Sequence, residues 1–121
     1  STAEDALAAD ALSKTLENLN IKDLEQLGDV QQDVLLLEML INFISINFEY
    51  RFSEKIGKDR SPIEASSIIK EIQDYIRSNL YETLKLSDIN DVNFLDLSNS
   101  QYVDSALIDA YSIFENLYTE D

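Results

Sequence analysis

The sequence predicts an all-α fold, a four-helix bundle-like domain with a long central second helix and an irregular segment before the last helix. The 121 residues include only two glycines and one proline, so few loops and tight turns are expected. Hydrophobic residues make up 45% of the chain and charged residues 27%, which is typical of a globular protein. This length fits a single domain over residues 1–121.

The first helix is expected to run from Thr2 to about Leu19. Ser1 and Glu4 have the spacing of a capping box, in which two side chains satisfy backbone N–H groups at the helix start. The apolar face of this helix carries Ala8, Leu12, Leu16 and Leu19. One short helical turn is expected to follow and to end at Gly28.

The second helix is expected to begin after Asp29 and to end at about Ile56, with Gly57 as its stop signal. Asp29 and Gln32 again have the spacing of a capping box. At the rise of an α-helix this segment is about 40 Å long, which is long for so small a domain. We therefore expect it to lie at the centre of the bundle.

The third helix has the clearest start. Ser61 suits the N-cap, Pro62 suits the first helical position, and Glu64 is placed to bond back to the cap. The apolar positions of this helix are Ala65, Ile68, Ile69, Ile72, Ile76, Leu80 and Leu84. Their helical spacing predicts one face buried against the rest of the bundle.

The last helix is expected to start between Ser98 and Ser100 and to end near Tyr118. Its main apolar face carries Val103, Ala106, Leu107, Ala110, Phe114 and Leu117. Residues 85–100, before it, show no clean periodicity and fit a loop, a short helix or a pair of short strands.

A narrow polar stripe crosses the otherwise apolar second helix. Eleven of the fifteen residues from 34 to 48 are apolar, yet polar residues recur at spacings of four, three and four. These residues are Glu38, Asn42, Ser45 and Glu49. The run is too short and too interrupted to span a membrane. Glu38 is expected to be exposed, or paired with a base from a neighbouring helix or subunit.

The second and last helices together carry more apolar surface than a small bundle is expected to hide. The last helix shows a second seam at Tyr111, Phe114 and Tyr118, beside its main apolar face. Surplus apolar surface of this kind commonly forms an interface between chains. The predicted contact residues are Tyr111, Phe114, Tyr118, Leu36, Ile44 and Phe48. The expected partner is a second copy of the chain or another protein.

The net charge of −15 makes nucleic acid and anionic membrane unfavourable direct partners. Residues 86–121 contain eight acids and no base. The N-terminus is acidic where a secretion signal needs bases, so a cytoplasmic location, or one inside a phage or viral particle, is expected. One basic cluster interrupts the acidity, at Arg51, Lys55, Lys58 and Arg60. It fits a solvated helix end, or a contact with phosphate or an acidic partner.

The residues that most enzymes use are scarce in this chain. Histidine and cysteine are absent, and the two glycines stand alone, so neither a thiolate metal site nor a phosphate-binding loop is expected. Catalytic residues, a metal and a cofactor are therefore not expected. A remote alternative is a magnesium-dependent all-α nucleotide pyrophosphohydrolase using Glu38, Asn42, Glu71 and Asp74. Only one of the two acidic pairs of that pattern is present.

Binding to another protein is the function that these observations favour. We expect a non-enzymatic adaptor, assembly factor or small regulatory subunit, with affinity from apolar helix faces and selectivity from the acidic surround. The alternative is an acidic mimic of DNA, of the kind found in phages and mobile elements, that inhibits a nucleic-acid-binding protein. Such a mimic needs acids spaced like phosphates, and no single helix carries an acidic stripe.

Overall fold

A computed structural model describes residues 2–119, which are almost entirely helical. The elements in chain order are α1 (Thr2–Asn18), α2 (Leu24–Leu27), α3 (Gln32–Gly57), α4 (Pro62–Thr83), α5 (Leu86–Asn90), the 3-10 helix η1 (Leu97–Asn99) and α6 (Gln101–Tyr118). Within residues 2–119 no strand forms, and the all-α prediction is confirmed.

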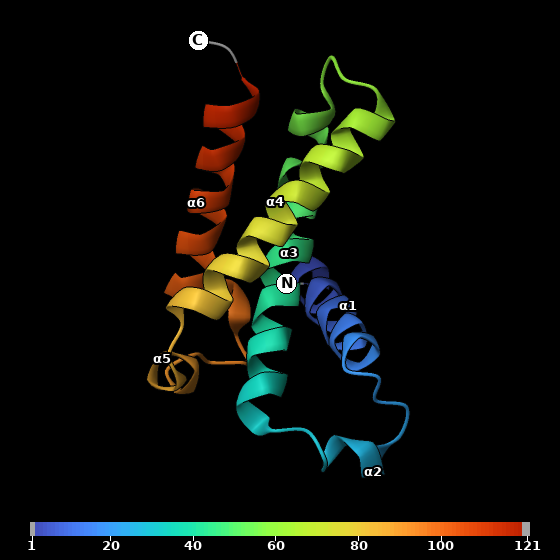
Figure 1. The fold of residues 1–121 in the computed structure, drawn as a ribbon, viewed down its shortest axis with the longest axis vertical. Coiled ribbons are helices and arrows are strands. Elements are labelled where there is room, and N and C mark those ends of the chain that lie inside the picture. Colours follow the sequence, from blue (N-terminus) through green and yellow to red (C-terminus); the bar gives the residue numbers. More distant parts are fainter. Residues whose placement is uncertain (1, 120–121) are drawn as a thin grey trace.

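The long helix α3 lies at the centre, as predicted. α1 packs along one side of it, and α4 crosses it on another (Figure 1). α6 contacts both α3 and α4, while the short α5 lies near the amino end of α3. α2 lies beyond that amino end, on the loop that joins α1 to α3 (Figure 1).

The start of α3 differs from the prediction. Its N-cap is Gln31, which makes no capping side-chain bond, so the capping box expected at Asp29 and Gln32 is wrong. The reason is that the backbone N–H of Asp29 donates to the Gln26 carbonyl at 3.1 Å. Asp29 therefore belongs to the turn that ends α2, and α3 begins only at Gln32, with Gln31 in the cap position. The capping box expected at Ser1 falls on a residue outside the described range.

The start of α4 agrees with two of its three sequence signals, and the predicted role of Glu64 is wrong. The Ser61 hydroxyl accepts a hydrogen bond from the Glu64 N–H at 3.1 Å, and Pro62 is the first helical residue. The Glu64 carboxylate lies 3.6 Å from the Arg60 side chain rather than reaching back to the cap. In the ambiguous segment, the short-helix alternative is correct: Asp88 accepts from the Lys85 N–H at 2.9 Å and starts α5.

The hydrophobic core is built around α3. Six of its residues are at most 1% exposed: Leu40, Ile41, Phe43, Ile44, Phe48 and Ile56. Ile72 of α4, with Val103 and Ala110 of α6, supply the facing surfaces. Each large buried side chain stabilises the fold by about 1.5–3 kcal/mol relative to exposure. None of the helices over residues 2–119 has the length and apolar character that crossing a bilayer requires.

Candidate functional site

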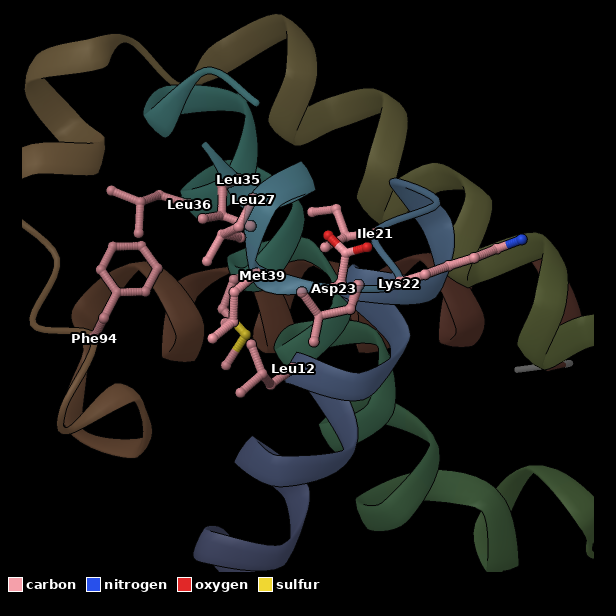
Figure 2. Close-up of a pocket in the computed structure, with 11 residues that line it drawn as sticks. Leu12, Ile21, Lys22, Asp23, Leu27, Leu35, Leu36, Met39 and Phe94 are labelled. Atoms are coloured by element: carbon pink, nitrogen blue, oxygen red, sulfur yellow. The ribbon is translucent and has the colours of Figure 1, made fainter. Parts of the chain in front are cut away.

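An apolar hollow of about 540 Å³ lies between the end of α1, the short α2 and the first turns of α3 (Figure 2). Its nine apolar lining residues are Leu12, Leu16, Ile21, Leu24, Leu27, Leu35, Leu36, Met39 and Phe94. Phe94, from the loop after α5, lies at one end of the hollow, away from Ile21 and Lys22 (Figure 2). The lining is therefore as apolar as a protein core, but the chain leaves it exposed to solvent.

The short helix α2 forms one wall of the hollow without packing into the core. None of its four residues is buried, and Leu24 is 86% exposed. Its helical turn is held by local bonds: the Asp23 carboxylate accepts from the Gln26 N–H at 3.1 Å, and the Gln26 side chain accepts from the Asp23 N–H at 3.3 Å. This capping box fixes the turn without any contribution from burial of its leucines.

The opposite wall comes from α3 and α1. Leu36 and Met39 are half-buried, and Leu12 of α1 is 48% exposed. Figure 2 shows these three side chains around a common space. Leu36 belongs to the six predicted contact residues, and the structure places it beside an open apolar surface.

Four acids, called the rim, lie on or next to the segments that line the hollow. Asp23 lines it, and Glu25, Asp29 and Asp33 are exposed on α2, the following turn and the start of α3. Lys22 is the lining base, and its amine extends away from the leucines (Figure 2). The rim therefore favours a partner that brings positive charge.

The polar residue Glu38, on the turn of α3 that also carries Met39, is 6% exposed. Its Oε1 accepts hydrogen bonds from Arg77 at 2.7 Å and from the Tyr81 hydroxyl at 2.6 Å, both on α4. Burial alone raises the pKa of Glu38, but the bonds from Arg77 and Tyr81 and the charge of Arg77 outweigh burial and lower it. The paired alternative for Glu38 is thus correct and the exposed one is wrong.

The rest of the polar stripe also joins helices of the same chain. The Asn42 amide donates to the Thr15 hydroxyl of α1 at 3.0 Å, and both side chains are buried. Gln73 of α4 donates to the Ser45 carbonyl at 2.9 Å and lies 3.4 Å from the Glu49 carboxylate. The stripe therefore ties α3 to α1 and α4, and only its last member, Glu49, is exposed.

The predicted aromatic seam of α6 packs within the chain. Tyr111 lies 4.6 Å from Phe52 of α3, measured between ring centroids, and 5.7 Å from Phe114. The row continues to Phe48 at one end and to Tyr118 at the other. The structure thus places the seam against α3, and Phe52 and Tyr111 also line a second hollow, of about 390 Å³, between α3 and α6.

Three of the six predicted contact residues are covered completely by the chain's own side chains. Phe114 is 2% exposed, and Ile44 and Phe48 are fully buried, so in this conformation they offer no surface to a partner. Tyr111 and Tyr118 are half-buried, and a contact role for their exposed edges remains a prediction.

Two residues of the basic cluster, Arg60 and Lys55, contact α6, and the other two lie exposed on the surface. The Arg60 guanidinium donates to the Ile56 carbonyl at 2.9 Å and to the Tyr118 carbonyl at 2.6 Å, which joins the ends of α3 and α6. The Lys55 amine lies 5.2 Å from the centre of the Tyr111 ring, and its hydrogen bond to Tyr111 raises its pKa. Arg51 and Lys58 are exposed on the surface of α3 and just beyond its end.

The carboxylates of the hydrolase alternative have separate partners in the structure. Glu71 accepts a hydrogen bond from the Tyr118 hydroxyl, and Asp74 lies 4.0 Å from the Lys70 amine. Glu38 and Asn42 bond to Arg77 and Thr15 respectively, as described above. Among residues 2–119, three or more potential metal-ligating side chains do not gather at any point.

The comparison with protein families gives a match over nearly the whole chain. Residues 1–114 match the family described as Qat anti-phage system associated protein QatB. The chain belongs to the QatB family. The matched residues contain every wall of the apolar hollow, from Leu12 to Phe94. No curated protein and no solved structure matches the chain.

Proposed function

We propose that this chain is a non-enzymatic protein-interaction component of an anti-phage system, and that it binds another protein of that system through the apolar hollow. Its QatB family is described as associated with the Qat anti-phage system, which supports the biological setting. The observation that carries the proposal is the hollow itself, an uncovered surface with nine apolar lining residues beside a packed core.

The physical basis is the balance between apolar and charged surface at this place. Burying apolar area supplies most of the affinity in protein association, at about 25 cal/mol per Å² before the costs of association. The acidic rim at Asp23, Glu25, Asp29 and Asp33 adds selectivity by repelling acidic proteins. A complex formed in this way depends on apolar burial first and on charge second.

The test is co-purification with the other proteins of the same anti-phage system, with the molar mass of the complex measured by light scattering. A complex that survives about 0.5 M salt, where exposed charges are strongly screened, is the expected result. A complex that dissociates as the salt concentration is raised would instead indicate binding through the acidic surface, as the DNA-mimic alternative requires. Absence of any complex would contradict the proposal.

The non-enzymatic part of the proposal has its own assay. The purified chain is expected not to hydrolyse nucleoside triphosphates in the presence of magnesium, because Glu38, Glu71 and Asp74 each have a protein partner. Magnesium-dependent hydrolysis that is abolished by Glu71→Gln would contradict this part and favour the hydrolase alternative.

A further inference from the structure

We propose that the occupant of the hollow is one amphipathic helix of a partner protein, with apolar side chains on its inserted face and lysine or arginine along its edges. This inference rests on the proposed function, because it names the kind of segment that the hollow binds. Three observations support it: the chemistry of the lining, the helical walls and the charge of the rim.

The lining favours apolar side chains over a small polar ligand. A small-molecule site usually has several convergent polar groups that fix the ligand's orientation. Here the polar lining residues are Lys22 and Asp23; the Asp23 carboxylate is used to cap α2, and the Lys22 amine extends away (Figure 2). Leucine and methionine walls instead suit the leucine, isoleucine or phenylalanine side chains of another chain, since flexible methionine adapts to their shape.

The walls also favour a helical segment over an extended one. All three principal walls are helices, whose backbone groups are largely used within the helix, so no sheet edge is available for an added strand. An extended peptide pressed against leucines would leave its own backbone N–H and C=O groups unbonded and desolvated. A helix satisfies these groups internally and presents apolar residues on one face.

The rim selects the charge of the partner and disfavours a second copy of this chain. From residue 12 to residue 39 the chain has six acids, of which Glu38 is buried and paired with Arg77, and two bases. One base, Lys14, lies 3.9 Å from Glu17. A second copy with its own charge of −15 would bring acids against acids, whereas a helix edged with lysine or arginine would find complementary charge.

Two exposed leucines on different walls make the inference testable without disturbing the fold. Leu24 is 86% exposed and Leu12 is 48% exposed, so Leu24→Glu and Leu12→Glu are expected to fold normally. Ile63→Glu is the matched control, because Ile63 is 84% exposed but lies at the start of α4, outside the hollow. Each variant adds the same single negative charge.

The probe is an array of overlapping peptides, each about five helical turns long, that covers the other proteins of the same anti-phage system. Peptides that bind the full chain are expected to be amphipathic as helices and net basic. Fluorescence anisotropy then measures the affinity for the peptide that binds most tightly. Leu24→Glu and Leu12→Glu should each weaken this affinity about tenfold or more, and Ile63→Glu should leave it unchanged. Circular dichroism should show the peptide gaining helix on binding.

The other outcomes separate this inference from the proposed function. Binding peptides that are acidic, or that stay non-helical, would overturn the inference. So would binding unaffected by Leu24→Glu, or a dimer of the chain itself that Leu24→Glu dissociates. A co-purified complex with no array peptide bound would overturn the helical occupant while leaving the proposed function intact. Failure of every protein of the system to co-purify would overturn both.

Discussion

The two ends of α3 differ in how completely the chain covers them. At the carboxyl end, Phe48 and Phe52 continue into the aromatic row of α6, and Arg60 joins the helix ends. At the amino end, Leu36 and Met39 are half-buried and line the hollow. Both ends are rich in apolar residues, so composition alone does not explain the difference.

The explanation lies in the elements that face each end. The carboxyl end packs against α6, a helix of 18 residues whose rings reach across to α3. On the side of the hollow, the amino end faces α2, which has four residues and none buried (Figure 1). The short α2 therefore leaves apolar residues of α1 and α3 open at this end.

The largest effect is expected from Phe114→Ala at the closed end. Phe114 is 2% exposed and contacts the rings of Tyr111 and Tyr118, so its removal leaves a cavity in the aromatic row. The free energy of unfolding should fall by about 3–5 kcal/mol, measured by urea denaturation. A loss below about 1 kcal/mol would mean that this end is not packed as described.

A smaller loss is expected from Arg60→Ala, which removes the bonds to the Ile56 and Tyr118 carbonyls. The Arg60 side chain is 17% exposed, and its guanidinium also lies 5.3 Å from the Phe114 ring centre. The free energy of unfolding should fall by about 2 kcal/mol. Arg60→Lys is the control: it keeps the charge but cannot bond both carbonyls in the same way, so it should recover only part of the loss.

Glu38→Gln is expected to lower the free energy of unfolding by a smaller amount, about 1–2 kcal/mol at pH 7. Arg77 is partly exposed, so solvent screens its ion pair with Glu38. The effect of Glu38→Gln should depend on pH. The pKa of Glu38 is lowered in the folded chain, so its stabilisation is complete above the unfolded pKa of about 4.3 and is lost as pH falls through the lower folded value.

Unfolding curves of the parent and the Glu38→Gln variant should therefore differ at neutral pH and converge in acid. A difference between them that stays constant down to about pH 3 would show that the Glu38 carboxylate is not stabilised by Arg77 and Tyr81.

The smallest effect on stability is expected at the open end. Leu24→Ala should change the free energy of unfolding by less than about 0.5 kcal/mol, because the side chain is 86% exposed in the free protein. Thermal denaturation of the two proteins measures this directly. A clear destabilisation would mean that α2 packs on the bundle and that the hollow is closed in solution.

The long helices could be predicted from sequence because their signals are local. Ser61 and Pro62 lie next to the helix that they start, and the spacing of apolar residues gives the buried face of α4 correctly. The face predicted for α1 is wrong, because Leu7, Ala11 and Thr15 are buried there and Leu12 is 48% exposed. Local signals also caused the error at Asp29, where the correct spacing was present but the residue lies in the turn after α2, two positions before the N-cap of α3.

The candidate site was harder to predict because it depends on contacts between distant residues. The second seam of α6 has the spacing of an interface, but Phe52, 59 positions before Tyr111, covers it. The two possibilities for Glu38 could be resolved only by Arg77, 39 positions away. Leu24 and Leu27 carried the available signal for the hollow: two leucines at i, i+3 in a turn too short to be buried.

The isolation of α2 has a consequence for hydrogen exchange. Its helical turn is held by the Asp23–Gln26 capping box and by no buried side chain, so its amides should exchange with deuterium far sooner than those of α3. A partner that covers Leu24 would slow this exchange without altering the central helix. Deuterium uptake at residues 24–27 would then serve as an intrinsic, label-free reporter of occupancy.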